Sequence, residues 1–201
     1  MIKTPPSKDF DLQKKICLEK LYKPDKSRKG EVDKPIIPLI DYLNRLDDFY
    51  TTSSCSGRIM LLTHAEKKPD VKWLYASHEK VKLSDIKKIL GDKDNLPKEM
   101  VWIRQESMIL HVACRSIDDA NNILKIARDI GLRRSGIIAD SNIIMVEICS
   151  TESVDVPLAD KGRLIVDDGY IKMITVIVNQ KFMKGRERLK RLEKDVREKL
   201  R

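Results

Sequence analysis

A run of small hydroxyl and thiol side chains, TTSSCSGRI at 51–59, is the most unusual local feature of the sequence. It leads into Gly57 and Arg58 between two apolar segments. Hydroxyls and backbone N–H groups at a tight glycine turn can bind an anion, and an arginine can grip a carboxylate or phosphate through two hydrogen bonds. The alternative is a polar hairpin. Cys55 is a possible nucleophile, although a lone cysteine on a strand is more often a small core residue.

A second polar cluster, HVACRS at 111–116, joins an expected strand to an expected helix. His111 lies in the middle of the strand, and Arg115 and Ser116 stand at the start of the helix. A helix N-terminus beside an arginine is a natural anion site. The alternative is a core histidine followed by an ordinary helix cap.

Two further clusters could contact nucleic acid. In WLYASHEK, the alternation of a strand places Trp73 and Tyr75 on one face, and His78 follows the strand. Exposed aromatic rings beside cations can stack a base, whereas the alternative is that both rings belong to the core. In LRRSGI, a basic and small segment leaves a helix and enters a strand; it contains Arg133, Arg134, Ser135 and Gly136.

The hydrophobic pattern places these clusters on alternating helices and strands. Asp33 can cap a helix with Pro35 in its first turn, and Ser116 with Asp119 resembles a capping box whose helix ends at Gly131. We expect hairpins within 101–114 and 135–149. The further expected helices are 8–22 and 84–90, and the expected strands are 49–55, 58–63, 71–76, 101–104, 108–114, 135–139 and 143–149. The order predicts a compact two-layer α+β sandwich with a mixed or antiparallel sheet.

The C-terminal segment tests the choice between strand and helix. Residues 170–178 are rich in β-branched side chains, which favour a strand. Apolar residues nevertheless recur in steps of three and four from Ile171 to Leu200. A strand joined to a helix would not keep that phase, so we predict one long basic helix over about 168–200, capped by Asp167 or Asp168.

The charge is concentrated at the two ends. The chain has 201 residues with 40 Lys and Arg against 31 Asp and Glu, a net charge of +9. Residues 1–34 carry +4 and residues 181–201 carry +6, so 35–180 carry −1. Basic ends suit contacts with phosphates, although a solubilising surface is the alternative. In the N-terminal arm (1–34) the candidates are Lys26, Arg28 and Lys29.

Composition and missing motifs exclude several classes. A 41% hydrophobic content with 8 Gly and 8 Pro excludes collagen-like and Gly/Pro-rich disordered chains. No stretch reaches the roughly 18 apolar residues of a membrane span, and the first residues have no apolar signal region, so we expect a single-domain cytoplasmic protein. The four scattered cysteines predict no metal site or disulfide scaffold and suggest reduced, mostly buried thiols. The phosphate-binding and dinucleotide glycine motifs are missing.

Five short motifs, taken in order, resemble the wybutosine-pathway tRNA methyltransferase family. They are DKSRKGEVD, YTTSSCSGRI, the W…SH pair at Trp73 and Ser77-His78, LHVACRS and RRSGI. The resemblance continues through VPL at Val156–Leu158 and covers roughly residues 8–200. It implies an α+β fold unlike the Rossmann methyltransferases, S-adenosylmethionine as methyl donor, and the anticodon stem-loop of phenylalanine tRNA as substrate. The methylated atom would be a nitrogen of the tricyclic base made from guanosine beside the anticodon.

If the chain is such a methyltransferase, the polar clusters can be given hypothetical roles. His78 or His111 would be the base, with Asp25 and Asp33 as weaker candidates. The cofactor-binding candidates are Ser54, Ser56, Gly57, Arg58, Arg115 and Ser116, and the RNA-binding candidates are Lys26, Arg28, Lys29, Trp73, Tyr75, Arg133, Arg134, Ser135 and Gly136. The main rival is a non-catalytic RNA-binding module with a polar phosphate cradle, followed by a small-molecule or anion-binding protein.

Overall fold

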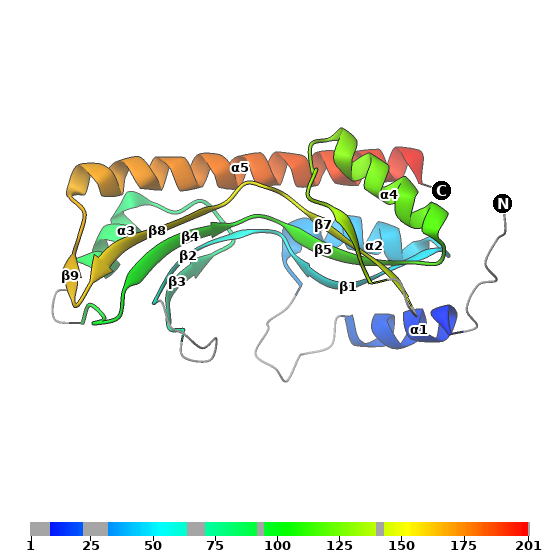
Figure 1. Cartoon of the computed structure of the whole chain (residues 1–201), viewed down its shortest axis with the longest axis horizontal. Coiled ribbons are helices and arrows are strands. Elements are labelled where there is room, and N and C mark those ends of the chain that lie inside the picture. Colours follow the sequence, from blue (N-terminus) through cyan, green and yellow to red (C-terminus); the bar gives the residue numbers. More distant parts are fainter. Residues whose placement is uncertain (1–8, 22–31, 64–70, 92–94, 140–142, 201) are drawn as a thin grey trace. The chain divides into compact units, whose positions relative to one another are not determined.

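The computed structural model describes residues 9–21, 32–63, 71–91, 95–139 and 143–200 (Figure 1). It is an α+β structure with two antiparallel sheets. The chain divides into two compact units. The first unit comprises Met1–Ser56, Met108–Thr151 and Glu187–Arg201, and the second comprises Gly57–Ser107 and Glu152–Arg186.

The first unit is built on a four-stranded sheet in the order β1-β5-β7-β6. Its elements are α1 (Phe10–Leu21), a 3-10 helix (Lys34–Ile36), α2 (Ile37–Arg45), β1 (Phe49–Cys55), β5 (Ile109–Cys114), α4 (Ile117–Asp129), β6 (Gly136–Ala139), β7 (Ile144–Cys149) and the C-terminal part of α5 (Asp168–Lys199). Apolar residues of α2, α4 and α5 form one core with the strand residues Leu110, Val112, Val146 and Ile148. This covered side is the inner face of the sheet.

The opposite, outer face of the same sheet is covered only in part. Figure 1 shows α1 on this side, with α4 and the end of α5 on the other. Phe10 of α1 packs on Tyr50 and Ala113, with ring centroids of Phe10 and Tyr50 5.0 Å apart. The strands place polar residues on the remainder of this face, as described below.

The second unit has a five-stranded sheet in the order β3-β2-β4-β8-β9. Its elements are β2 (Arg58–Thr63), β3 (Trp73–Ser77), α3 (Leu83–Leu90), β4 (Val101–Glu106), β8 (Val154–Asp160), β9 (Arg163–Leu164) and the N-terminal part of α5. Its separate core packs α3 and α5 against residues such as Leu61 and Ile103.

The long C-terminal helix is present as predicted. Asp167 caps it, because Oδ1 of Asp167 accepts a hydrogen bond of 2.7 Å from the backbone N–H of Tyr170. Buried residues follow the predicted steps of three and four, at Ile171, Ile174, Val178, Phe182, Leu189, Leu192, Val196 and Leu200. Burial on one helix face therefore outweighs the β propensity of residues 170–178.

The hairpin expected within 101–114 is wrong, and so is the alternative of a polar hairpin at 51–59. β1 pairs with β5, whereas β2 pairs with β3 and β4, so the polar segment around Ser56 is not a hairpin. β4 and β5 also belong to different sheets. Each of these strand pairs is split between the two units, which local turn chemistry does not reveal. The hairpin of β6 and β7 is confirmed.

The sequence pattern missed β8 and β9. Val154, Val156 and Leu158 of β8 do alternate with Asp155 and Pro157, but a proline cannot donate to a strand ladder and argues against a strand. β8 nevertheless pairs with β4 over Val154–Ala159, with an irregular register beside Val101 and Trp102.

Other predictions have mixed outcomes. All four cysteines are free, but only Cys114 is buried, so the expectation of mostly buried thiols is wrong. None of the described helices is long and apolar enough to cross a membrane. The single domain over 1–201 and the cytoplasmic location stay predictions.

Candidate functional site

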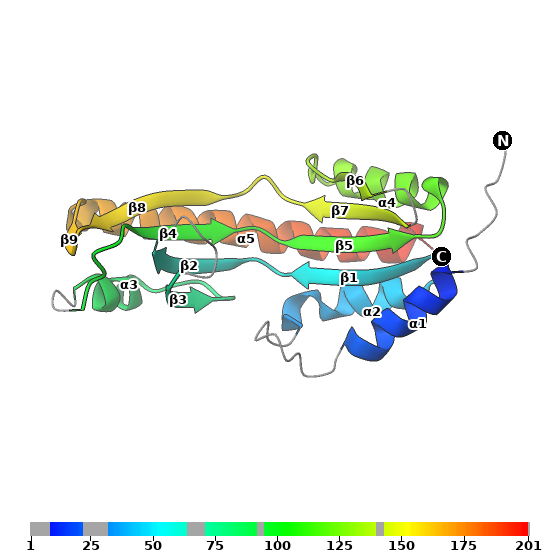
Figure 2. The ribbon, with the colours of Figure 1, turned by 60° about the horizontal axis from the view of Figure 1, so that its bottom comes forward.

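Three polar side chains form a row across the outer face of the first unit's sheet. Ser53 on β1 lies directly opposite His111 on β5, and His111 lies directly opposite Glu147 on β7. Figure 2 shows β5 running between β1 and β7. On the far side of β7, Gly136 of β6 is the partner of Glu147. Ser53, His111 and the adjacent Gly136 thus come from three clusters noted in the sequence, whereas Glu147 does not.

A β-bulge puts Ser53 into this row. The pairing runs from Thr51 opposite Val112 to Ser53 opposite His111, which leaves Thr52 as the extra residue. Without the bulge, Ser53 would lie opposite Leu110, on the inner face that carries the core. Bulges commonly redirect a side chain next to a functional site.

Hydrogen bonds connect the row into a chain. Ser53 Oγ lies 2.8 Å from His111 Nδ1, and His111 Nε2 lies 2.9 Å from Glu147 Oε2. An ionised carboxylate can only accept, so Nε2 carries a proton and donates it. Nδ1 of the neutral imidazole is then the acceptor for the Ser53 hydroxyl. A hydroxyl, an imidazole and a carboxylate linked in this order can move a proton.

The surroundings of Glu147 include a thiol and a guanidinium. Cys149 Sγ donates to Glu147 Oε1 over 3.8 Å. Burial, followed by the charge of Glu147, raises the pKa of the Cys149 thiol, whereas the charge of Arg134 acts in the opposite direction. Arg133 and Arg134 are exposed, while Ser135 is buried and accepts a hydrogen bond from the Cys149 backbone N–H.

The other hydroxyl residues of the 51–59 segment have different surroundings. Ser54 lies opposite Leu110, on the inner face, and is half-buried. Ser56 is buried, and both its backbone N–H and its hydroxyl donate to Asp33 Oδ2, over 2.7 and 3.0 Å. The 3-10 helix begins directly after Asp33, so the Asp33 carboxylate anchors the end of β1 to the start of that helix.

In the second unit, Arg58 forms a platform with an exposed tryptophan. Arg58 Nε donates to Glu106 Oε2 over 2.8 Å, and the guanidinium carbon lies 4.7 Å from the centre of the Trp73 ring. The Trp73 residue is 55% exposed, so the alternative that it belongs to the core is wrong.

Trp73 and Tyr75 lie on different faces, contrary to the sequence prediction. Leu61 lies opposite Tyr75 and Leu62 lies opposite Trp73, which leaves Leu74 of β3 as the extra residue of a bulge. Leu61 faces the core of the second unit, and Tyr75 packs against that core. The extra strand residue shifts the alternation by one, so only Trp73 stands beside Arg58.

His78 is held by the backbone of its own unit. Its Nδ1 lies 3.0 Å from the carbonyl oxygen of Gly57, which adopts a positive φ of 93°. A carbonyl oxygen only accepts, so Nδ1 donates this hydrogen bond. Arg186 Nη2 donates to the His78 carbonyl oxygen over 2.5 Å.

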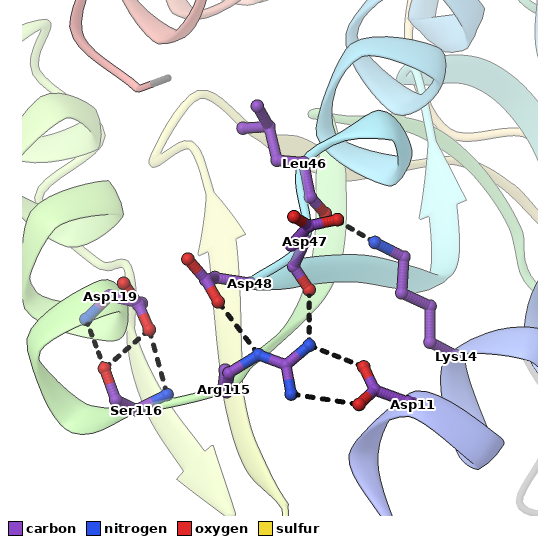
Figure 3. A network of polar contacts seen from close by, with 8 residues as sticks. All are labelled: Asp11, Lys14, Leu46, Asp47, Asp48, Arg115, Ser116 and Asp119. Carbon is purple, nitrogen blue, oxygen red and sulfur yellow. Dashed lines mark hydrogen bonds and ion pairs between the residues drawn. The ribbon is translucent and has the colours of Figure 1, made fainter. Parts of the chain in front are cut away.

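Arg115 is the centre of an ion-pair network in the first unit (Figure 3). Its Nε donates to Asp48 Oδ1 over 2.8 Å, Nη2 donates to Asp11 Oδ1 and to the Asp47 carbonyl oxygen, and Nη1 donates to Asp11 Oδ2. The guanidinium also lies over the ring of Phe10. Each of its three nitrogens is engaged, and the two hydrogen bonds to Asp11 attach α1 to the sheet.

The network shifts the pKa values of Asp11 and Arg115. The hydrogen bond from Arg115 lowers the pKa of the exposed Asp11 carboxyl, and the same hydrogen bond raises the pKa of Arg115. Beside it, Ser116 and Asp119 form the predicted capping box of α4, with the Asp119 backbone N–H donating to Ser116 Oγ over 3.1 Å.

Several predicted residues lie outside the described part of the chain, and two residues of the row were not predicted. Asp25, Lys26, Arg28 and Lys29 fall in the segment 22–31, which the structure does not describe. Ser53 and Glu147 were not among the site candidates. Ser53 is found only once the bulge is known, and Glu147 occupies an ordinary polar position in an alternating strand.

We expect Arg115→Ala to loosen α1. Because the pKa of Asp11 is lowered from its ordinary 3.8, the ion pair contributes fully above that value and is lost as pH falls through the lowered one. Hydrogen exchange should show reduced protection of α1 amides in the variant at neutral pH. In the unmodified chain the same loss should appear only on acidification below about pH 4. Unchanged protection relative to Lys125→Ala, an exposed cation of α4, would contradict this role.

Comparisons with known proteins agree with the resemblance. The family model described as Methyltransferase TYW3 matches residues 12–198. A Pyrococcus furiosus protein named tRNA(Phe) 7-((3-amino-3-carboxypropyl)-4-demethylwyosine(37)-N(4))-methyltransferase 1 is 40% identical over 172 residues, covering 84% of this chain and 86% of the relative. A human protein named tRNA wybutosine-synthesizing protein 3 homolog is 35% identical over 195 residues, covering 92% and 71%. The structure of the PH1069 protein from Pyrococcus horikoshii has a TM-score of 0.86 at 34% identity, covering 96% and 98%. The chain belongs to the Methyltransferase TYW3 family.

Proposed function

We propose that this chain methylates a ring nitrogen of the tricyclic, wyosine-type base beside the anticodon of phenylalanine tRNA, with S-adenosylmethionine as donor. The observation that carries the proposal, beyond family membership, is the chain from Ser53 through His111 to Glu147 on the outer face. A nitrogen that lacks its methyl group must lose a proton when it is methylated, and this chain can accept one. The relatives' names specify a demethylated base of tRNA(Phe) and its N(4) atom.

Arg58 fits the carboxylate of such a donor, and Arg115 does not. Arg58 Nε donates to Glu106. The two terminal nitrogens of Arg58 form no hydrogen bond with the described residues. They can take a carboxylate with two parallel hydrogen bonds. Arg115 has no nitrogen left for a ligand. The donor would supply an electrophilic methyl group on a sulfonium; the chain's task is to hold it and to manage the proton.

The donor would be bound without a Rossmann fold. The described strand pairs are antiparallel, whereas a Rossmann site needs parallel strands and a glycine-rich turn before a helix. The missing glycine motif in the sequence supports the same proposal.

The anticodon stem-loop would be held by exposed cations and by one exposed aromatic ring. Trp73 offers a stacking surface, and Arg133 and Arg134 are exposed beside β6. The basic end of α5 adds exposed cations, including Lys184, Lys190 and Arg191. These groups neutralise phosphates without reading sequence. The non-catalytic alternative is not favoured, because the family is one of methyltransferases.

The function is tested by methyl transfer in vitro. The purified chain should transfer a radiolabelled methyl group from S-adenosylmethionine to tRNA from a strain blocked just before this step. It should not label fully modified tRNA, in which that nitrogen already carries its methyl group. Binding of the demethylated tRNA without any label transfer would favour the RNA-binding module instead.

We expect Arg58→Ala to weaken donor binding about tenfold, because a charge-assisted hydrogen bond contributes about 1.5 kcal/mol. Isothermal calorimetry with S-adenosylmethionine measures the change. The matched control is Arg104→Ala, because Arg104 on the neighbouring strand forms an analogous ion pair with Asp155. Equal affinities for the two variants would remove Arg58 from the donor site.

The role of α5 in RNA binding is tested by substitution, because truncation before Lys184 would remove Leu189, Leu192 and Val196 from the core. The triple variant Lys184→Gln, Lys190→Gln, Arg191→Gln should reduce the slope of log affinity for tRNA against log salt by about 0.7 to 0.9 per lost phosphate contact. The control replaces Lys88, Lys98 and Lys125, which are exposed in the neutral part of the chain, with Gln. Equal slopes for the two triple variants would assign α5 a structural role only.

A further inference from the structure

We propose that Ser53 is a catalytic residue of the methyl transfer, that His111 acts on the substrate only through Ser53, and that Glu147 is a positioning residue that fixes the histidine's tautomer. This inference rests on the proposed function and assigns the contact with the methylated nitrogen to a serine hydroxyl instead of an imidazole.

The hydrogen bonds of the two His111 ring nitrogens lead to this assignment. Both ring nitrogens of His111 are engaged, Nδ1 by Ser53 and Nε2 by Glu147. No ring nitrogen remains to meet a substrate directly, so a proton can reach His111 only through one of these two neighbours. The His111 and Glu147 side chains are 27% and 30% exposed, whereas Ser53 is an exposed residue on the same face. The Ser53 hydroxyl is therefore the accessible end of the chain.

The direction of proton transfer follows from the acceptor at the other end. Glu147 accepts from Nε2 and so leaves the Nδ1 lone pair for the Ser53 O–H. Methylation of the nitrogen forms an N–C bond, breaks the donor's C–S bond and releases the N–H proton. That proton passes to Ser53 Oγ while the hydroxyl proton passes to His111 Nδ1. The resulting imidazolium faces the Glu147 carboxylate, which stabilises its charge.

The neighbouring polar groups do not offer the same path. Burial and the charge of Glu147 keep Cys149 protonated by raising the pKa of its thiol. Thr52 lies next to Ser53 in the chain, but its hydroxyl donates to Met145 Sδ over 3.7 Å. Thr52 is thus an exposed hydroxyl of the same strand that lies outside the hydrogen-bonded chain, and it provides a matched control.

The kinetic test compares Ser53→Ala with Thr52→Val in the full chain. Ser53→Ala should lower kcat for methyl transfer to demethylated tRNA(Phe) by about 100-fold, the lower range of general acid–base catalysis. Affinities for S-adenosylmethionine and for the tRNA, measured by calorimetry and gel shift, should stay within about twofold, because Ser53 acts on the proton. Thr52→Val should keep the kcat of the unmodified chain.

The positioning role of Glu147 has a readout that needs no substrate. Long-range ¹H–¹⁵N spectra of the ¹⁵N-labelled chain at neutral pH should show His111 with its proton on Nε2. Glu147→Ala should convert this signal to a mixture of tautomers and lower kcat at least tenfold. Glu147→Gln still offers a carbonyl oxygen to Nε2 and should retain the Nε2–H tautomer, with a kcat between those of the other two.

Three results would overturn the inference: a kcat for Ser53→Ala equal to that of Thr52→Val, a His111 proton on Nδ1 in the unmodified chain, or an unchanged tautomer in Glu147→Ala. Failure of the proposed function is distinguishable, since the unmodified chain would then transfer no methyl group to the tRNA while the tautomer measurement still gave its result.

Discussion

The register of β5 between β1 and β7 is the constraint on which the candidate site depends. Directly opposed residues share a face, so Ser53, His111 and Glu147 meet because these pairs are opposite one another. A slip by one residue would turn His111 toward the apolar core and expose Leu110 or Val112. The cost of that exchange holds the register, because the burial of Leu110 and Val112 against the helices is lost with it. The apolar inner face thus positions the polar outer face.

The same constraint explains the bulge at Thr52. Residues 49–51 place Phe49 toward the core and Tyr50 toward α1, and the polar residues that follow are not needed in the core. One extra residue reverses the phase between Thr51 and Ser53, so that Ser53 instead of Thr52 lies opposite His111. Arg115 lies at the opposite end of β1, where its ion pair with Asp11 attaches α1 over Tyr50 and Ala113.

Much of the fold was predictable from the sequence, because its signals are local. The capping box at Ser116, the cap at Asp167 and the apolar steps of the last helix are each set by residues within a few turns. The pairing of the strands was not predictable, because the strand that follows β1 in the chain and the strand that follows β4 each belong to the other sheet. The two bulges also escaped prediction: one separates Tyr75 from Trp73, and the other brings Ser53 to His111. Motif resemblance identified the family and the clusters, but the individual roles depend on these register shifts.

We propose that exposed cations neutralise the phosphates of the tRNA, while a short hydrogen-bonded chain on one sheet face accepts the proton. In this proposal the methylated nitrogen meets the Ser53 hydroxyl. The most direct measurement is a crystal structure of the chain with S-adenosylhomocysteine and an anticodon stem-loop that carries the demethylated tricyclic base. We expect the base nitrogen within hydrogen-bond reach, about 3 Å, of Ser53 Oγ, with His111 still hydrogen-bonded to both Ser53 and Glu147. A base bound on another surface, or a nitrogen in direct contact with His78, would contradict it.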